Sequence, residues 1–481
     1  MRRSRLWLLA TITVVAAIAV VGSLVTPAGR VARAAHGSLA PVLATQLVCP
    51  TVTGGGSAGQ STDMVVANVG AGPAPRTTYS LVSPSARSRA PIPLALRPSA
   101  LVRKGSSYGA VLVNASGPGA GGVVATQASL IPNGLGRGLL DVACRPPATD
   151  WWFAGADGGV RVEDRLWLVN AADTPANVAI SFWSGRGPLS PPNTTGIVVA
   201  AHSALVRKLS DYAPDVPQVA FHVHANSGTV AVGVTDLRNL GDRPTGSDFL
   251  PPTLAPTRSS IVTGFMPGAT YGLVDIVNPS NHDATVSLRV VTSTKDFAPA
   301  GHQSVVVRAG HTVRVDLSAI IATEVAAVAV DSDTPVTAAA LTATRPTSGF
   351  TELAWLPAQA PLAGPAAIAD NVPPFGQKVS LIVTAPATSA RLRVANATGS
   401  SATVSVPAGR TRNVDLRALF HAGATGPGPI VLTPLSGAVY VIRTLYAVGA
   451  HGPLMAASTP MLLPAATELP AVVDDPRAAL P

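Results

Sequence analysis

Two histidines alternate along one stretch of the sequence in a pattern that could bind a metal. His222 and His224 lie in the run VAFHVH, which is predicted to be a strand, so both side chains point to the same face. Imidazoles placed in this way could chelate a transition metal. No Cys, Asp or Glu nearby in the sequence is clearly placed to complete the site. We therefore interpret the pair as solvent-facing strand histidines and predict no metal site and no cofactor.

Two further patterns resemble functional motifs. Residues 55–59 read GGSAG and match the G-x-S-x-G turn of serine hydrolases, but that turn needs a strand before it and a helix after it. Here the pattern lies in a Gly- and Ser-rich segment that precedes a predicted strand, so we interpret it as a loop. Asp331 and Asp333 resemble half of a calcium site. Asp is also favoured in hairpin turns, where it bonds to the backbone, and we predict such a turn.

Aromatic residues are concentrated between Asp150 and Trp183. Alternation along a strand cannot bury both Trp151 and Trp152 on one face, so one is expected in a core and the other exposed or at a domain junction. An exposed tryptophan could stack on a sugar ring, although junction packing is favoured. The predicted ligand-binding or interdomain cluster consists of Trp151, Trp152, Phe153 and Trp167. We find no catalytic residues.

Cys49 and Cys144 are the two cysteines of the chain. Both follow a hydrophobic N-terminal segment that predicts export, and an even number of cysteines outside the cytoplasm indicates a disulfide. The bond would close a loop of roughly 95 residues and stabilise the fold by about 4–5 kcal/mol.

The composition favours a folded, turn-rich chain. Of 481 residues, 44 are Gly and 44 are Pro, while 47% are hydrophobic and only 12% are charged, the reverse of a disordered sequence. The net charge of +9 includes three arginines near the N-terminus. The rest of the chain lacks the clustered basic face, interleaved with aromatics, that nucleic-acid binding requires, so we predict no nucleic-acid partner.

The N-terminal residues have the features of a membrane-targeting segment. Residues 1–5 carry three arginines and form a predicted cytoplasmic stub, and the uncharged run from Leu6 to Val25 is long enough to span a hydrocarbon core of about 30 Å. The arginines orient this segment with the rest of the chain outside the cytoplasm. We expect an uncleaved signal-anchor. A cleaved and secreted protein is the alternative, since small residues suitable for cleavage follow the segment.

The remainder of the chain repeats one β-rich design. Strands ending in Asn68, Asn170, Asn278 and Asn396 are followed by a polar turn and a second apolar strand, with the asparagines about 100–120 residues apart, the size of a domain. Short alternating strands with frequent turn signals predict immunoglobulin-like antiparallel sandwiches. Stiff Pro-rich joints between them suggest a string of domains. The predicted segments are 26–44 (linker), 45–146, 147–250, 251–357 and 358–464 (four β-sandwiches, the last shortened) and 465–481 (a tail). The shortened sandwich has either lost a pair of strands or extends its sheet with Lys378 to Thr384.

The segment WWFAGADGG…LWLVNAADTPANVAISFW resembles a repeat, W-Y-F-A-x-G…L-x-L-x-N-P, found in actinobacterial secreted or membrane-anchored proteins of a domain family of unknown function. Trp151, Phe153, Gly155, Leu166 and Asn170 are among the matching residues. Asp157 stands where a glycine is expected, and the Asn-Pro turn occurs only at Asn278 and Pro279. The resemblance implies an extracytoplasmic β-sandwich and supplies no activity.

Together these observations predict a non-enzymatic, extracytoplasmic protein of the cell envelope. It would be all-β, with tandem immunoglobulin-like domains after one transmembrane helix, and would serve as a structural or protein-interaction module. Its expected partners are the membrane, through Leu6 to Val25, and an envelope protein or cell-wall glycan. The alternative is a secreted or surface carbohydrate-binding or adhesive protein. A hydrolase or transferase is disfavoured because no acid–base pair or activated nucleophile is visible.

Overall fold

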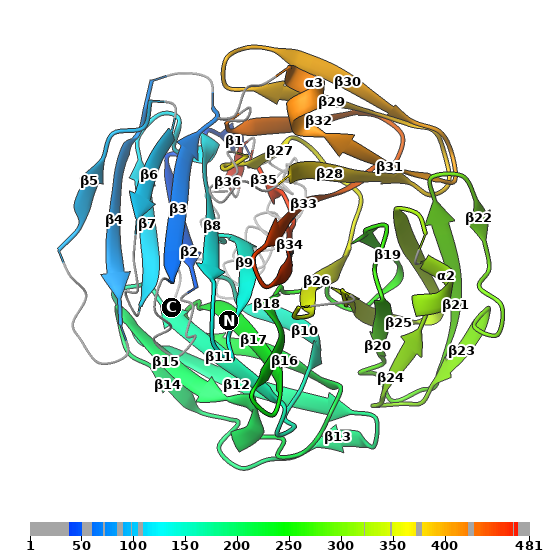
Figure 1. The fold of residues 1–481 in the computed structure, drawn as a ribbon. Helices are drawn as coiled ribbons and strands as arrows, with labels where there is room; N and C mark the ends of the chain where they lie inside the picture. Colours follow the sequence, from blue (N-terminus) through cyan, green and yellow to red (C-terminus); the bar gives the residue numbers. More distant parts are fainter. Residues whose placement is uncertain are drawn as a thin grey trace, which may run out of the picture. The chain divides into compact units, whose positions relative to one another are not determined.

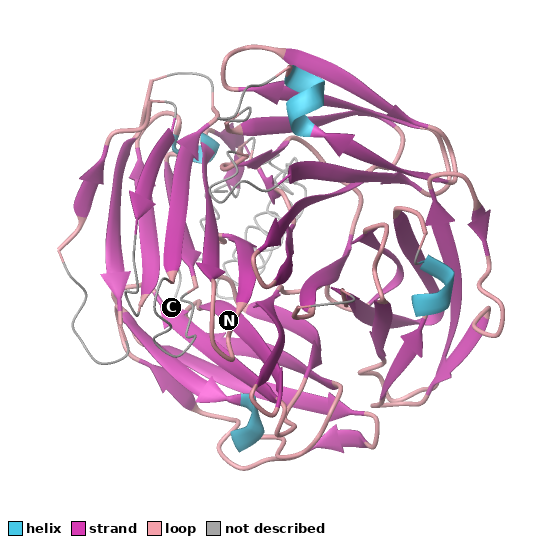
Figure 2. Cartoon of the chain, in the orientation of Figure 1, coloured by secondary structure: helices cyan, strands magenta, loops and turns pink. Residues whose placement is uncertain are grey.

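The computed structural model describes residues 38–50, 60–70, 73–83, 90–97, 99–103, 109–321, 323–346, 349–371, 378–421, 428–464 and 466–469. These residues form antiparallel strands joined by turns and a few short helices (Figure 2), so the all-β prediction is confirmed. None of the helices in these ranges is both long enough and apolar enough to cross a membrane. The predicted anchor, residues 6–25, and the GGSAG segment lie outside the described residues.

The chain divides into two compact units. One comprises Met1–Pro41 and Ala466–Pro481, and its described part is an antiparallel pair of strands, β1 (Ser38–Ala40) and β36 (Thr467–Leu469). The other, Val42–Ala465, contains all the remaining strands.

The larger unit contains four consecutive sandwich-like arrangements of antiparallel sheets, here called sandwiches 1 to 4 (Figure 1). Sandwich 1 pairs sheet β2-β7-β4-β5 with sheet β6-β3-β8-β9, and sandwich 2 pairs β10-β16-β12-β13 with β15-β11-β17-β18. Sandwich 4 pairs β30-β29-β32-β27-β35 with β31-β28-β33-β34. In sandwich 3, β19 to β26 form one eight-stranded sheet that supplies both layers.

The strands of sandwiches 1 and 2 are β2 (Ala44–Cys49), β3 (Ser61–Asn68), β4 (Arg76–Val82), β5 (Ile92–Leu94), β6 (Ser99–Arg103), β7 (Ala110–Ser116), β8 (Val123–Ile131), β9 (Gly138–Ala143), β10 (Asp150–Ala156), β11 (Val162–Asn170), β12 (Ala176–Ser184), β13 (Gly187–Leu189), β14 (Ile197–Val199), β15 (Ser203–Lys208), β16 (Val219–Ser227), β17 (Ala231–Leu240) and β18 (Arg243–Leu250).

The elements of sandwiches 3 and 4 are β19 (Thr257–Phe265), β20 (Tyr271–Val277), β21 (Ala284–Thr292), β22 (Asp296–Phe297), β23 (Ser304–Val307), β24 (Thr312–Asp316), α2 (Ser318–Ile321), β25 (Ala326–Thr344), β26 (Glu352–Gln359), β27 (Ala366–Ile368), β28 (Lys378–Ala385), β29 (Ala390–Asn396), β30 (Ser401–Val406), β31 (Arg410–Asp415), α3 (Leu416–Phe420), β32 (Ile430–Ser436), β33 (Tyr440–Gly449), β34 (Gly452–Ser458) and β35 (Met461–Leu462).

The core of sandwich 2 shows how alternation in the sequence builds a layer. Along β12, Val178, Ile180 and Phe182 are buried between the two sheets, while the residues between them face outward. Phe182 packs near Phe221 of β16, with ring centroids 5.8 Å apart. One apolar face on each sheet is enough to hold the layers together, since burial of such side chains contributes about 1.5–3 kcal/mol each.

Buried asparagines tie the two layers together in sandwiches 2 and 3. The Nδ2 group of Asn170 donates to Thr174 O (2.8 Å) and to Val199 O (3.0 Å), and Oδ1 accepts from Ala172 N. Asn278 makes the same bonds at the same sequence offsets, donating to His282 O (2.7 Å) and Val307 O (2.9 Å) and accepting from Ser280 N. The recurring asparagine therefore has a structural role, because both side chains are fully buried and bonded.

The alignment of Asn396 with these residues is wrong. Asn396 ends β29, which pairs with β30 and β32 in the other sheet. The strand that matches β3, β11 and β20 is β28, which pairs with β31 and β33 as those strands pair with their neighbours. Aligned on β28, sandwich 4 contains a four-stranded sheet equivalent to those of the first two sandwiches, so the predicted shortening came from the misplaced asparagine.

Cys49 and Cys144 form the predicted disulfide, with Cα atoms 4.4 Å apart. Cys49 ends β2 in one sheet of sandwich 1, and Cys144 directly follows β9 in the other. Both are buried in the core of the sandwich, so the bond joins its two sheets.

The sandwiches meet at their last strands, β9, β18, β26 and β34. Each of these strands contacts the next, and β34 of sandwich 4 contacts β9 of sandwich 1, so the contacts form a closed cycle and not the linear string suggested by the sequence. We call this region the central junction. Apolar cores also extend across boundaries, because Leu341 and Trp355 of sandwich 3 belong to the core of sandwich 2.

The buried asparagine generates a stability prediction. Asn170→Ala should lower the free energy of unfolding by about 3 kcal/mol, because it removes three hydrogen bonds and leaves the buried Val199 carbonyl without its partner. Asn278→Ala should have a similar effect. The matched control is Asn396→Ala, in a partly exposed turn, which should cost about 1 kcal/mol or less. Urea denaturation measures all three, and equal losses for Asn170→Ala and Asn396→Ala would contradict the assignment.

Candidate functional site

The candidate site lies on the outer face of the sheet formed by β10, β16 and β12. His222 and His224 project from β16 to this face, and Asp150 at the start of β10 lies between their rings. Oδ1 of Asp150 is 3.0 Å from Nε2 of His222 and 2.8 Å from Nδ1 of His224. The three potential ligand atoms lie within 4.8 Å of one another.

The sequence identified the two histidines but missed the carboxylate. Asp150 is 72 residues before His222 and 74 before His224, and it reaches them because it is paired directly with His224 across the antiparallel ladder of β10 and β16. Its position at the start of the aromatic run was visible in the sequence, but the pairing register was not.

The environment sets the charges of this cluster. The hydrogen bond from His224 lowers the pKa of Asp150, with additional bonds from Thr149 and His222, so the carboxyl group is ionised at neutral pH. Partial burial lowers the pKa of His222, although Asp150 opposes the effect. The site therefore presents an anionic oxygen and a neutral imidazole, which are the forms that bind cations.

Two tryptophans adjoin the cluster. Trp152 stacks on His222, with centroids 4.1 Å apart and an interplanar angle of 11°, and also stacks on Trp183 at 5.5 Å and 20°. Both are partly buried. Trp151 points the opposite way into the core, as alternation along β10 requires, and its Nε1 donates to Val230 O.

The four residues of the predicted aromatic cluster do not come together. Trp151 and Phe153 lie in the core of sandwich 2, whereas Trp152 lies on the outer face. Trp167 lies on β11, in the other sheet, and packs between sandwiches 1 and 2 with Val48 and Leu112. These residues are therefore separated, because they lie on opposite faces of a strand or in different sheets. The aromatic residue that stacks on Trp152 is Trp183.

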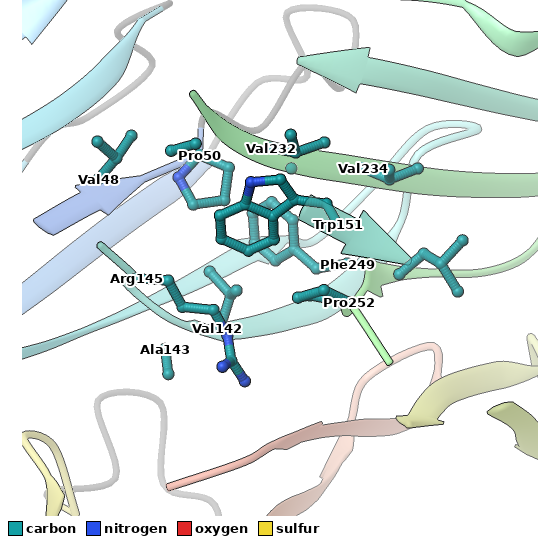
Figure 3. Close-up of a pocket in the computed structure, with 13 residues that line it drawn as sticks. Val48, Pro50, Val142, Ala143, Arg145, Trp151, Val232, Val234, Phe249 and Pro252 are labelled. Atoms are coloured by element: carbon teal, nitrogen blue, oxygen red, sulfur yellow. The ribbon is translucent and has the colours of Figure 1, made fainter. Parts of the chain in front are cut away.

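A cavity of about 20 Å³ adjoins the Trp151 indole at the boundary of sandwiches 1 and 2 (Figure 3). Pro50, Val142, Val232 and Phe249 are among its mostly apolar lining residues. It has room for about one water molecule, so the surroundings of Trp151 are packing and not a ligand pocket.

The sequence matches a family of unknown function, DUF5719, over residues 100–417. The chain belongs to this family. The DUF5719 region begins within β6 and ends within α3, so it includes the Asp150, His222 and His224 cluster and all of sandwiches 2 and 3.

No curated protein matches this DUF5719 chain. Among solved structures, a Thermotoga maritima protein is similar with 11% identity and a TM-score of 0.19, covering 21% of this chain and 95% of that one. A tetra-tandem repeat from the extending region of a large adhesion protein covers 87% of this chain and 99% of its own, with 13% identity and a TM-score of 0.11.

The interior of the DUF5719 chain contains a second group of ionisable residues. At the central junction, Asp248 accepts hydrogen bonds from Trp355 N (2.9 Å) and Asp141 N (3.4 Å), and Glu352 accepts from Ser247 N (3.2 Å). Asp141 forms an ion pair with Arg443. These bonds connect different sandwiches, so the carboxylates hold the junction together.

Two of the buried carboxyl groups have raised pKa values and are therefore protonated more readily than exposed ones. Burial raises the pKa of Asp248 well above its usual value, and burial followed by the negative charge of Asp236 does the same for Asp164. Asp236 itself accepts from Nε1 of Trp355 (2.6 Å) and pairs with Arg238. Arg238 also lies over the Trp355 ring, 5.4 Å from its centroid.

Asp331 and Asp333 do not lie in the predicted hairpin turn. They occupy the middle of β25, at the point where this strand passes from one layer of sandwich 3 to the other. Asp331 accepts from the Ser259 hydroxyl (2.6 Å), and Asp333 accepts from Thr285 N (2.8 Å). The two carboxylates thus bond to neighbouring strands of their own sandwich.

Glu352 generates a pH-dependent prediction. Burial raises its pKa from 4.5 to about 8, against the opposing charge of Arg137. Between these values the folded protein retains a proton that the unfolded chain has released, so the free energy of unfolding should fall as the pH rises. The contribution is at most about 1.4 kcal/mol per pH unit.

Glu352→Gln should remove this contribution, whereas Glu163→Gln, at a side chain that is 41% exposed, should retain the wild-type dependence. Denaturation in urea at several pH values between about 4.5 and 8 measures both variants. If Glu352→Gln kept the wild-type slope, the raised pKa would be contradicted.

Proposed function

We propose that this DUF5719 protein is a non-enzymatic, extracytoplasmic protein of the cell envelope, in which four immunoglobulin-like sandwiches form a rigid structural or protein-interaction module. The observation that carries the proposal is the central junction. Buried polar bonds such as those of Asp248 and the ion pair of Asp141 with Arg443 link different sandwiches. Breaking a buried pair by removing one partner costs about 3–5 kcal/mol, so relative movement of the sandwiches is strongly opposed.

The burial of the interior carboxylates supports a structural role for them. Asp141, Asp248 and Glu352 are at most 2% exposed and lie among packed strands. A catalytic acid or base must come within hydrogen-bonding distance of its substrate, and these groups are covered by protein. The raised pKa values of Asp248 and Glu352 follow from burial at a junction, which perturbs structural carboxylates as it does catalytic ones.

The disulfide supports a location outside the cytoplasm. Cys49 and Cys144 are bonded within a core, and such bonds persist in oxidising compartments. The apolar run from Leu6 to Val25 provides the proposed anchor. The two features agree, since the proposed orientation places both cysteines on the outer side of the membrane.

Cell fractionation of the full chain in its native host tests this proposal. The protein should remain in the membrane pellet after a carbonate wash, should be released by detergent, and should carry the intact residues 1–25, because a spanning segment is held by about 20 apolar residues. Crosslinking before release should retain an envelope protein. Recovery from the medium, with an N-terminus near Gly29 or Ala35, would overturn the anchor, and a cytoplasmic protein with free thiols would overturn the location.

A carbohydrate-binding function is the second candidate, favoured by the partly exposed Trp152 and Trp183 on one outer face. Aromatic contacts contribute about 1 kcal/mol, so Trp183→Ala should weaken sedimentation with insoluble cell-wall glycan about fivefold. The control is Leu240→Ala, an apolar side chain of the same sandwich that is 51% exposed. Equal sedimentation of both variants and the wild type would contradict binding at the tryptophans.

A further inference from the structure

The cluster of Asp150, His222 and His224 has the composition of a transition-metal site. Two imidazole nitrogens and one carboxylate oxygen lie within 4.8 Å of one another. Zinc binds His nitrogen at about 2.0–2.1 Å and carboxylate oxygen at about 2.0–2.2 Å, so a metal between the three groups requires only small side-chain rotations. Calcium and magnesium prefer sets of oxygen ligands and do not match two imidazoles.

The ligands are carried by regular strands and not by loops. His222 and His224 are two residues apart on β16, which lies between β10 and β12 in the sheet, and Asp150 pairs with His224 in the ladder. The backbone of β16 is therefore fixed by hydrogen bonds on both sides, and that of Asp150 by the pairing of β10 with β16. Sites built on such elements are more precise than sites on loops.

Neighbouring side chains orient two of the three ligands. The indole of Trp152 stacks on the imidazole of His222 with centroids 4.1 Å apart, which restricts rotation of that ring. The Thr149 hydroxyl donates to Oδ2 of Asp150 (2.8 Å), so Oδ1 is the oxygen directed to the histidines. Outer contacts of this kind hold metal ligands in place in known sites.

We propose that Asp150, His222 and His224 bind a divalent transition metal, with zinc as the first choice. The ligand atoms are Oδ1 of Asp150, Nε2 of His222 and Nδ1 of His224. Each imidazole binds as the neutral ring, with its proton on the other ring nitrogen, and the metal replaces the hydrogen bonds to Asp150. Three protein ligands leave a fourth position, which water fills in the isolated protein. Asp150 and His224 are about half exposed, so this position is open to solvent.

The same sandwich contains a matched control. His202 and Asp173 also form a pair, with Nε2 of His202 2.7 Å from Oδ1 of Asp173. Asp173 is more exposed than Asp150, and His202 is about as exposed as His224, but the only cluster of three or more such groups found among the described residues is that of Asp150. The His202–Asp173 pair therefore offers two potential metal ligands, whereas the proposed site offers three.

The experiment uses the tag-free full chain in detergent, stripped with EDTA and titrated with Zn²⁺ by calorimetry. The expected result is one Zn²⁺ per chain, with affinity lowered at least about tenfold by Asp150→Asn and by His224→Ala. His202→Ala should leave the affinity unchanged. Asp150→Asn preserves the shape of the side chain, and a thermal melt without metal checks that each variant is folded.

Co²⁺ loading gives an independent readout at the ligands. The wild-type protein should show visible ligand-field absorption, and Asp150→Asn and His222→Gln should lose it. Absence of Zn²⁺ binding by the wild type would overturn the proposal. So would binding that Asp150→Asn and His224→Ala leave unchanged, because the cluster would then be an ordinary hydrogen-bonded group. Neither result depends on the anchor or on an envelope partner.

Discussion

The carboxylate of Asp248 constrains how the sandwiches pack. It lies on β18 of sandwich 2 and accepts a backbone N–H from Trp355 of sandwich 3 and another from Asp141 of sandwich 1. A buried carboxyl group without such partners would cost several kcal/mol. Asp248 therefore has both of these donors only when the last strands of three sandwiches lie together. Arg443 of sandwich 4 completes the cycle by pairing with Asp141.

This arrangement divides the polar groups of the protein into two classes. Those at the central junction are buried and bonded across sandwich boundaries, and they specify which strands meet. Those on the outer face of sandwich 2, where Asp150, His222 and His224 gather, are reached by solvent and by any partner. In the first class, burial raises the pKa of Asp248 and Glu352, whereas the second class has an open arrangement of potential ligand atoms. Solvent accessibility therefore separates the two classes.

Local patterns in the sequence were sufficient to predict that the chain forms layers of β-strands. Period-two alternation predicted the all-β class and the opposite directions of Trp151 and Trp152, and export predicted the bond between Cys49 and Cys144. The glycine at position 155, by contrast, is explained by a contact with another sandwich. Its φ is +94°, and a Cβ there would lie 2.4 Å from the Trp355 ring of the next sandwich.

Features that depend on the register of strand pairing could not be predicted from the sequence. Asp150 meets two histidines more than 70 residues away because β10 and β16 pair in one register, and no local signal fixes that register. Asn396 was misassigned because an apolar strand ending in Asn occurs in either layer. Asp141 and Glu352 lie in otherwise apolar segments, which was a sign of burial with a partner. The identity of the partner required the folded chain.

The hydrogen bonds of Asn170 and Asn278, here called the asparagine clamp, restrict the length of the chain between their partners. In sandwich 2 and again in sandwich 3, the carbonyl that the buried amide reaches is 29 residues further along, although the two intervening sequences share little. Substitutions in that interval change side chains and leave the clamp intact, whereas an inserted or deleted residue moves a different carbonyl into place. We infer that the interval tolerates changes of sequence more readily than changes of length. Among relatives, insertions should therefore accumulate in the other connections of these two sandwiches.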